Sequence, residues 1–418
     1  MTSLYHHVTD VDNLRSCFDD LDGKKAVGID GVTKEEYGKN LEENLAMLSQ
    51  RLKEMGYRPL DKKRAYIPKP GSKKGRPLAI SAFEDKIVEM AVRRVLEQVY
   101  EPLFLESSYG YREGRSPHQC IDAIGRTIQQ KRINHVVEAD IRSFFDRLNW
   151  AWLDKFLRHR IGDERLLRLI KRMLMAGIME DGLTHATEEG APQGAIVSPM
   201  LSNVYLHYAL DLWFEKRVKP HAKGEAHLFR FADDFLCAFQ FKEEAEAFER
   251  NLKDRLEGFN LEIAPEKTRR MEYGPYASKN AKRRGEKAPS FTFLGLTHYC
   301  GKTRHGHFKV KRHTSAKKFR AKLRDYTAWI RKARGKMLTG ELMRRAKSRL
   351  QGHLNYYAIT DNFEVCNRYH YWFTRITYKW VNRRSQRKSY NWKEFAQMLK
   401  SIKWPRVRIM VNLCPFRT

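Results

Sequence analysis

The sequence lacks long hydrophobic runs and has few cysteines. No stretch approaches the roughly 20 apolar residues that a membrane-spanning helix requires, and the polar residues 1–10 lack the basic and then apolar layout of a secretion signal. The six cysteines lie far apart, and no two have the spacing of a metal-binding knuckle. We therefore expect a cytoplasmic protein with reduced, mostly buried thiols, without a membrane span and without a structural zinc site.

Acidic residues are scarce in the last third of the chain. Residues 1–260 balance 41 Lys+Arg against 41 Asp+Glu, whereas residues 301–418 hold 31 against 5. Most of the net charge of +30 in this 418-residue chain therefore lies in its C-terminal third. Such a local excess is larger than solubility requires, and the phosphate backbone of nucleic acid is the partner that best matches it.

The chain shows no internal repeat and no long low-complexity tract. Apolar residues at three- and four-residue spacing predict helices over residues 34–55, 84–99, 149–175 and 243–257. Short apolar runs around turn residues predict two hairpins, over residues 64–80 and 227–241. Beyond an expected exposed loop over residues 276–289, the pattern becomes almost wholly helical. This arrangement predicts an α+β domain followed by a helical region.

Three carboxylates stand in apolar surroundings. Asp140 ends the apolar segment 135–140, and Asp233 with Asp234 occupies the tip of the second hairpin. A carboxylate among apolar residues is costly unless it is paired or binds a cation, and an adjacent like charge increases that cost. Mg²⁺ prefers carboxylate and water oxygens, and two such ions about 3.5–4 Å apart can activate a 3′-hydroxyl and stabilise a leaving pyrophosphate. The alternative is that the Asp-Asp pair only caps a tight turn, where Asp is favoured.

The segment Phe231-Ala-Asp-Asp234 between two hydrophobic runs resembles the metal-binding signature of reverse transcriptases. The family usually has Tyr at the first position, and Phe231 lacks only its hydroxyl group. Asp140 resembles the family's third metal-binding acid, and Phe145 stands at the family's aromatic position five residues later. The resemblance implies that Asp140, Asp233 and Asp234 are catalytic and hold two Mg²⁺ ions, for which Mn²⁺ can substitute. It also implies that Phe145 presses against the sugar of the incoming nucleotide and excludes a 2′-hydroxyl.

Two further blocks occur in the family's order. Ala191-Pro-Gln-Gly194, followed by Ser198-Pro199, resembles the nucleotide-pocket motif, which implies that Gln193 contacts the incoming deoxynucleotide. Lys69 and Arg76 stand seven residues apart in the first hairpin, which is the spacing at which the family's fingers bind the triphosphate. Arg suits phosphate because its planar fork donates paired hydrogen bonds, and Lys supplies a mobile charge. Taken alone, this basic hairpin also fits an ordinary solvated loop.

Other segments resemble the polymerase and maturase proteins encoded by bacterial group II introns. Gly28-Ile-Asp-Gly-Val-Thr33 resembles a motif in their N-terminal extension, and Ser108-Tyr-Gly-Tyr-Arg-Glu-Gly-Arg-Ser116 resembles their next block, with Glu113 where Pro is common. Phe293-Leu-Gly-Leu296 resembles the strand turn that grips the primer, which implies this role for Leu294 and Gly295. Two further segments resemble parts of their helical thumb, also called the maturase domain: Gly352-His-Leu-Asn-Tyr-Tyr357 and Trp380-Val-Asn-Arg-Arg-Ser-Gln-Arg387.

The resemblance implies a right-hand polymerase fold, in which fingers and a palm with an antiparallel sheet are followed by an all-helical thumb. We predict fingers, palm and an N-terminal extension over residues 1–296, and the thumb over residues 297–400. Tyr356, Tyr357 and Trp372 are expected in the core of the thumb, and the alternative is that aromatics among basic residues stack on bases. Residues 401–418 would form a short basic tail or a small DNA-binding appendage. No His/Asn endonuclease domain and no ribonuclease H domain is expected, which is typical of a compact class of these proteins.

We predict an RNA-directed DNA polymerase that also binds its own intron RNA as a splicing maturase. Its partners would be an RNA template, a DNA or RNA primer, deoxynucleoside triphosphates and structured intron RNA, and no membrane. The candidate RNA-binding residues are Arg344, Arg345, Lys347 and Arg349. The open alternative is a freestanding group II intron-like enzyme acting in DNA repair, phage defence or CRISPR adaptation, which only the flanking DNA distinguishes. A maturase without polymerase activity is disfavoured because the candidate polymerase residues are all present.

Overall fold

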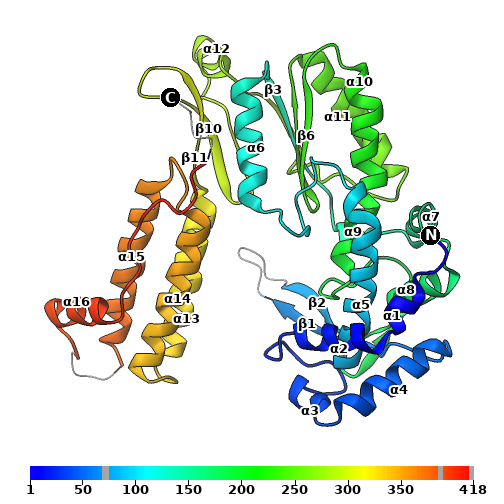
Figure 1. Cartoon of the computed structure of the whole chain (residues 1–418). Coiled ribbons are helices and arrows are strands. Elements are labelled where there is room, and N and C mark those ends of the chain that lie inside the picture. Colours follow the sequence, from blue (N-terminus) through cyan, green and yellow to red (C-terminus); the bar gives the residue numbers. More distant parts are fainter. Residues whose placement is uncertain (68–74, 385–388, 414–418) are drawn as a thin grey trace. The chain divides into compact units, whose positions relative to one another are not determined.

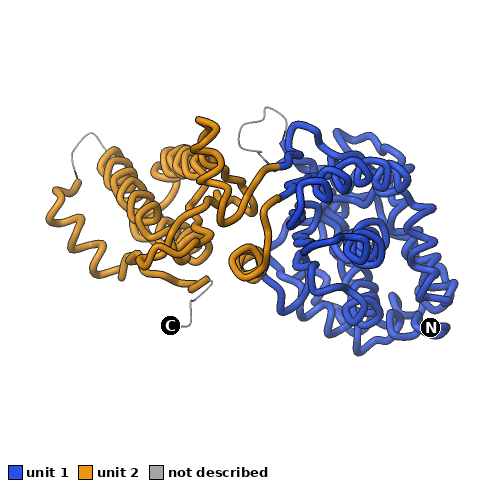
Figure 2. Tube along the Cα trace, turned by 90° about the horizontal axis from the view of Figure 1, so that it is seen from above, with its two compact units in different colours: residues 1–116, 136–270 blue, residues 117–135, 271–418 orange. Residues whose placement is uncertain are grey.

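A computed structural model describes residues 1–67, 75–384 and 389–413, so Lys69 lies outside the described residues. The chain forms two compact units, residues 1–116 with 136–270 and residues 117–135 with 271–418 (Figure 2). The second unit begins before residue 297 because the strands around the expected primer turn belong to one sheet with residues 308–314, which contact helices of this unit. The functional domains drawn with boundaries after residues 296 and 400 stay predictions.

The first unit combines helices with four-stranded sheets (Figure 1). Its helices are α1 (Tyr5–Thr9), α2 (Val11–Asp20), α3 (Lys34–Gly38), α4 (Leu41–Lys53), α5 (Phe83–Tyr100), α7 (Trp150–Arg158), α8 (Glu164–Met175), α9 (Ser198–Leu206), α10 (Lys219–His221) and α11 (Lys242–Glu257). The 3₁₀ turns are η1 (Glu101–Leu103) and η2 (Phe144–Arg147). The π-helical segments are η3 (His207–Asp211) and η4 (Phe214–Val218).

The strands of these sheets are β1 (Lys62–Ile67), β2 (Arg76–Ile80), β3 (His135–Asp140), β4 (Ile178–Glu180), β5 (Leu183–His185), β6 (Ala226–Phe231), β7 (Asp234–Phe239) and β8 (Arg269–Glu272). One sheet has the order β2-β1-β4-β5, and the other β6-β7-β3-β8. β1 and β2 pair antiparallel, with Ile67 opposite Arg76. β6 and β7 also pair antiparallel, with Phe231 opposite Asp234. The strand pairing of both predicted hairpins is therefore confirmed, whereas the tip of the first, residues 68–74, lies outside the described residues. β3 lies beside β7.

Two long predicted helices are each interrupted. The region 34–55 forms α3 and α4, because Asn40 leaves the helical conformation between them. The region 149–175 forms α7 and α8, and α8 begins where the carboxylate of Asp163 accepts hydrogen bonds from two backbone amides. A side chain that caps free amides in this way favours a new helix start.

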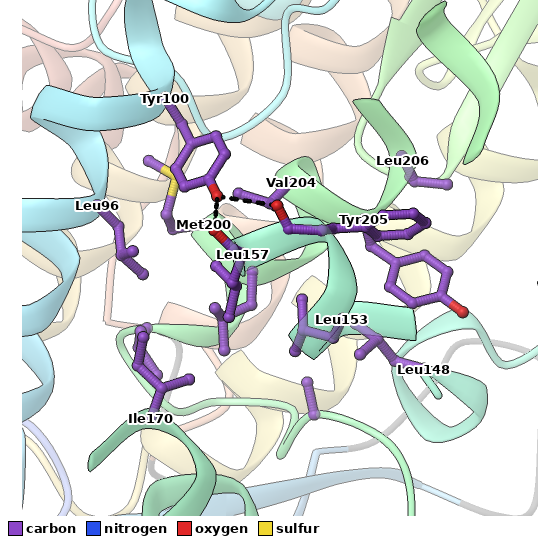
Figure 3. Packing of buried hydrophobic residues seen from close by; sticks show 14 of the residues in the cluster. Leu96, Tyr100, Leu148, Leu153, Leu157, Ile170, Met200, Val204, Tyr205 and Leu206 are labelled. Atoms are coloured by element: carbon purple, nitrogen blue, oxygen red, sulfur yellow. Dashed lines mark hydrogen bonds between the residues drawn. The ribbon is translucent and has the colours of Figure 1, made fainter. Parts of the chain in front are cut away.

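The core of the first unit brings α5, α7 and α9 together (Figure 3). Two buried tyrosines have partners for their hydroxyl groups. Tyr100 donates to the carbonyl oxygen of Leu157 at 3.2 Å, and Tyr205 donates to that of Phe259 at 2.6 Å. Because each hydroxyl has a hydrogen-bond partner, the cost of desolvating it in the core is offset. This packed layer supports the sheet that carries the predicted carboxylates.

The second unit contains one three-stranded sheet and a group of long helices. Its strands are β9 (Ser290–Phe293), β10 (Leu296–Lys302) and β11 (Phe308–Thr314), in the order β11-β10-β9. Its helices are α6 (Pro117–Gln130), α12 (Ala277–Arg283), α13 (Ala316–Ala333), α14 (Thr339–Tyr357), α15 (Phe363–Val381) and α16 (Trp392–Ser401). The prediction of an exposed loop over residues 276–289 was wrong for α12, whose Ala277 and Ala281 are buried, and is confirmed for residues 284–288, which are exposed and non-helical.

The described elements confirm a mixed α+β fold with antiparallel strand pairs in each sheet, a parallel pair between β1 and β4, and a helical C-terminal region. Stacked rings fill the helical core, where the centroids of Tyr326 and Phe373 lie 3.6 Å apart. Over the described ranges, no helix has both the length and the apolar character that crossing a bilayer demands.

Candidate active site

The three predicted catalytic carboxylates lie on neighbouring strands. Asp140 ends β3, Asp233 lies in the turn between β6 and β7, and Asp234 begins β7. Ala232 has a φ of 59°, a left-handed conformation that lets the chain reverse sharply. Because β3 lies beside β7, the carboxyl group of Asp140 comes close enough to Asp234 to raise its pKa. The fold therefore brings carboxylates from distant parts of the chain to one place.

Burial and mutual repulsion raise the proton affinity of this cluster. Desolvation is the largest cause that raises the pKa of Asp234 to about 7, and the hydrogen bond with Asp140 and the charge of Asp233 raise it further. The pKa of Asp233 is also raised, mainly by burial and then by the charge of Asp140. Lys267 forms an ion pair with Asp140 and opposes these shifts. The cluster is thus most stable with positive charge nearby.

The donor atoms of the cluster suit a divalent cation. Carboxylates that raise one another's pKa are stabilised by a hard cation, and Mg²⁺ prefers such oxygen ligands. Within the described ranges, no group of three or more His, Cys, Asp or Glu side chains is already arranged as a complete metal site. Lys267 supplies the positive charge beside Asp140. Asp140, Asp233 and Asp234 are therefore candidate ligands, and their catalytic role stays a prediction.

The predicted nucleotide-pocket segment is tied to its neighbours through the backbone. The carbonyl oxygen of Phe145 accepts from the amide of Ala191 at 2.7 Å. The carbonyl oxygen of Gln193 accepts from the amide of Ala79, in β2, also at 2.7 Å. Gly194 has a φ of 114°, and a Cβ there would lie 2.9 Å from the Ala79 carbonyl oxygen. Glycine is required at this position, so the pocket segment can sit directly against the basic hairpin.

Other side chains predicted for the nucleotide pocket differ in exposure. Phe145 is 8% exposed and packs edge-on against Phe144, with ring centroids 5.6 Å apart. Arg76 is exposed, and its charge lowers the pKa of Asp233, so the guanidinium lies within electrostatic reach of the carboxylates. Sequence reasoning did not assign Tyr111, whose pKa is raised by burial and then by Asp233. Tyr111 therefore borders the same cluster.

Sequence reasoning also missed a buried arginine directly before the turn that carries Asp233 and Asp234. The guanidinium of Arg230, in β6, is fully buried and donates to both carboxylate oxygens of Asp211, at 2.7 and 2.6 Å. It also donates to the carbonyl oxygen of Ala232 at 3.1 Å and to the hydroxyl of Ser108 at 2.7 Å. A charge inside an otherwise apolar strand requires such partners, and this was the available signal. Arg230 thus binds the turn that carries the Asp-Asp pair.

The same hydrogen-bond network includes the Ser-Tyr-Gly-Tyr-Arg block. Asn203, in α9, accepts from Arg230 at 3.1 Å and donates to the carbonyl oxygen of Gly110 at 2.8 Å. A Cβ on Gly110 would lie 2.2 Å from the amide nitrogen of Ala232, so the block packs directly on the turn. Asp211 belongs to the π-helical segment η3, a departure from α-helix that is frequent near functional sites. Several motifs are therefore joined around one guanidinium.

The predicted primer-grip turn lies in the second unit. Leu294 and Gly295 connect β9 and β10 with φ angles of 48° and 79°. The hydroxyl of Tyr356 donates to the carbonyl oxygen of Leu294 at 2.8 Å. The hydroxyl oxygen of Tyr357 lies 2.9 Å from where a Cβ on Gly295 would stand. The strand turn and the tyrosine pair of α14 thus form one assembly, and its contact with a primer stays a prediction.

The four predicted RNA-binding residues lie on α14, and three of them have protein partners. Arg345 pairs with a glutamate one turn earlier, at 2.7 Å. Lys347 donates to a backbone carbonyl at 2.8 Å, and Arg349 covers a tryptophan ring at 4.2 Å. Arg344 is exposed. Trp372, which we expected in the thumb core, is 51% exposed, so that expectation was wrong.

Comparison with known proteins defines the class. Residues 67–298 match the family described as reverse transcriptase (RNA-dependent DNA polymerase). The chain belongs to this family, and the right-hand polymerase fold implied by its motifs is confirmed.

Within that family, the chain is related to proteins of group II introns. It is 36% identical over 206 residues to the group II intron-encoded protein LtrA of Lactococcus lactis, an alignment that covers 49% of this chain and 34% of LtrA. It is 30% identical over 351 residues to protein YkfC of Escherichia coli, covering 77% of this chain and 87% of YkfC. It is 31% identical over 129 residues to nuclear intron maturase 3, mitochondrial, of Arabidopsis thaliana, covering 31% and 18%. The chain thus spans about a third of LtrA.

Proposed function

We propose that this protein is an RNA-directed DNA polymerase that also binds structured intron RNA as a splicing maturase. The observation that carries the polymerase proposal is the cluster of Asp140, Asp233 and Asp234 in a chain of the reverse transcriptase family. Its substrates would be deoxynucleoside triphosphates, an RNA template and a DNA or RNA primer. The cluster is charged, desolvated and adjacent to the predicted nucleotide-pocket residues, which supports nucleotidyl transfer there.

Each group in the site would have a separate task. The three carboxylates would hold two Mg²⁺ ions, which supply activation of the 3′-hydroxyl and stabilisation of the leaving pyrophosphate. Arg76 and Lys69 would donate to the triphosphate, and Gln193 would contact the incoming deoxynucleotide. Phe145 would exclude a ribose because its ring occupies the space that a 2′-hydroxyl needs. Arg230 would touch no substrate and would position the turn.

The RNA-binding proposal has a different basis. Residues 301–418 carry 31 Lys+Arg against 5 Asp+Glu, and phosphate contacts are the general source of affinity for RNA. Two of the relatives are named as an intron-encoded protein and an intron maturase, which supports intron RNA as the partner. A freestanding enzyme without an intron would keep the polymerase and the charge and would lack only the splicing role.

The Asp234→Ala variant tests the polymerase proposal. We expect it to abolish cDNA synthesis on a primed RNA template, because a metal ligand is lost, and to leave the affinity for RNA unchanged. Asp254→Ala, which removes an exposed carboxylate from α11, is the matched control and should keep full activity. Primer extension and fluorescence anisotropy measure the two properties. Wild-type cDNA synthesis by Asp234→Ala would refute the proposed site.

A further inference from the structure

Three large aromatic side chains of the second unit are about half exposed. Tyr371 and Trp372, in α15, are 54% and 51% exposed, and Trp392, at the start of α16, is 45% exposed. Burying such rings stabilises a folded protein, so leaving three of them in water forgoes that contribution to stability. Contiguous exposed apolar patches mark interaction sites, whereas single exposed apolar residues are common on protein surfaces.

A cation lies between two of these rings. The guanidinium carbon of Arg375 lies 5.9 Å from the ring centroid of Tyr371 and 5.6 Å from that of Trp392. Exposed residues at helical spacing of three and four extend this surface along one face of α15. We call this surface the aromatic–basic face, and it consists of Arg368, Tyr371, Trp372, Arg375, Lys379 and Trp392. The sequence from residue 365 to residue 393 contains no Asp or Glu.

The ring of Trp392 is held in position by its neighbours. Trp392 packs edge-on against Tyr378, with centroids 4.9 Å apart. The helix that begins with Trp392 is fixed by a capping box, in which Asn391 and Glu394 each accept from the other's backbone amide, at 3.0 and 2.7 Å. A ring that is already oriented loses little conformational entropy when a ligand stacks on it.

The combination of rings and cations discriminates between forms of RNA. Phosphates are available on both duplex and single-stranded RNA, so Arg368, Arg375 and Lys379 alone would bind either form. Aromatic rings gain stacking energy only from base faces, and in a duplex those faces are already stacked inside the helix. A face that alternates rings with cations and lacks acids therefore matches unpaired nucleotides.

We infer that the aromatic–basic face binds unpaired RNA nucleotides, with bases stacked on Tyr371, Trp372 and Trp392 and phosphates paired with the cations between them. This inference rests on the proposed RNA-binding function and names the form of RNA that this surface selects. Loops, bulges and single-stranded ends of a folded RNA have the required chemistry. The three rings are the specificity-determining groups, and the cations provide affinity without selection.

Two RNA probes with equal phosphate counts test the inference in the full chain. One is a single strand of uridines and the other a blunt duplex, and anisotropy at one fixed salt concentration gives both affinities. The triple variant Tyr371→Ala, Trp372→Ala, Trp392→Ala should lose at least about tenfold in affinity for the single strand, since each stack contributes several-fold or more. Its affinity for the duplex should stay within about twofold. Arg375→Gln should weaken both probes.

Matched variants separate stacking from loss of fold or general affinity. Tyr276→Ala removes another exposed aromatic from the same unit, 67% exposed, and should change neither affinity. Trp372→Phe keeps a ring and should retain most of the single-strand affinity. Equal loss for both probes, or no loss for either, in the triple variant would overturn the inference while leaving the proposed RNA binding intact. Failure of the wild type to bind either probe would refute the proposed RNA-binding function itself.

Discussion

Arg230 holds the turn of the candidate site through hydrogen bonds without belonging to the site itself. Its five donors are shared among Asp211, Asn203, Ala232 and Ser108, so the turn is fastened to a helix and to a loop at once. Arg230→Lys keeps the charge and loses the planar fork, so it cannot serve all four partners. We expect kcat for nucleotide addition to fall at least about tenfold, because the carboxylates lose their support, with little change in RNA affinity.

A double variant separates positioning from stability. Removing one partner of a buried ion pair costs about 3–5 kcal/mol, whereas replacing both with apolar residues is often neutral. Arg230→Met should therefore lower the free energy of unfolding, and Arg230→Met with Asp211→Leu should restore it. If Arg230 positions the turn, kcat of the double variant stays low despite the recovered stability. Recovery of kcat together with stability would show that Arg230 acts only on the fold.

Phe145 provides the test of sugar selection. Phe145→Val removes ring volume without removing a metal ligand, so it should raise ribonucleotide incorporation by one to two orders of magnitude at a modest cost in deoxynucleotide use. Single-nucleotide primer extension with matched ribonucleotides and deoxynucleotides measures the ratio. Phe144→Val is the paired control, because Phe144 is 3% exposed and packs into the core. A larger change in selectivity from Phe144→Val would assign the barrier to the neighbouring ring.

At the residue scale, the sequence alone locates functional side chains whose flanking residues are unusual for them. Asp140, Asp233 and Asp234 stand out because apolar runs surround them, and the structure brings them together. Lys267 carries no such local signal, since its ion pair with Asp140 depends on how distant strands meet. Trp372 was misplaced for a related reason, because an apolar ring in a helix does not reveal which face the fold covers.

At the element scale, hairpins were predicted better than helix ends. A hairpin is specified by turn residues between two short runs, and that information is local. Helix interruptions near Asn40 and Gly162 were missed because apolar spacing continues across them, so periodicity does not detect the break. The helix α12 was missed because its short, basic and small-residue sequence resembles a loop.

The contact between α14 and the β9–β10 turn yields a prediction at this scale. Tyr356→Phe removes only the hydroxyl that donates to the Leu294 carbonyl oxygen at 2.8 Å. The loss of one hydrogen bond should lower the free energy of unfolding by about 1 kcal/mol. If the turn grips the primer, the KM for primer–template should rise severalfold while kcat for a bound primer stays near wild type. Tyr276→Phe, at an exposed position, should change none of these quantities.

A change in kcat without a change in the KM for primer–template in Tyr356→Phe would contradict the primer-grip role. Steady-state extension at varied primer–template concentration separates the two, and thermal unfolding monitors the hydrogen bond independently. Unchanged KM with the expected loss of stability would leave Tyr356 a structural residue of the second unit.

At the scale of the whole molecule, the order of predicted helices and hairpins indicated the mixed α+β class, but it did not show where the compact units divide. The helix α6 belongs to the second unit because Gln129 accepts from the amide of Val310 at 2.9 Å, and the ring of His118 bonds the carbonyl oxygen of Tyr356 at 2.8 Å. These contacts join residues about 180 to 240 positions apart, and no local pattern encodes them.

The uneven charge of the chain predicts a steep salt dependence of RNA binding. Each phosphate contact that is lost should reduce the slope of log affinity against log salt by nearly one unit. Arg344→Glu should flatten the slope, because this side chain is exposed on α14. Lys347→Glu should instead lower the unfolding temperature, because the Lys347 ammonium donates to a backbone carbonyl. Equal slopes for wild type and Arg344→Glu would remove α14 from the RNA-binding surface.

Splicing separates the two proposed activities, because folding an intron RNA requires binding and no polymerisation. With the flanking intron at low Mg²⁺, Asp234→Ala should splice nearly as well as wild type although it makes no cDNA. Arg344→Glu combined with Arg345→Glu should show the reverse, with splicing reduced and extension of a tightly bound primer less affected. Control reactions at high Mg²⁺ test whether the intron itself is competent. If the wild type promotes splicing of no flanking intron, or if Asp234→Ala binds RNA normally and yet splices none, the maturase role is refuted, and the freestanding polymerase accounts better for the same carboxylates and the same charge.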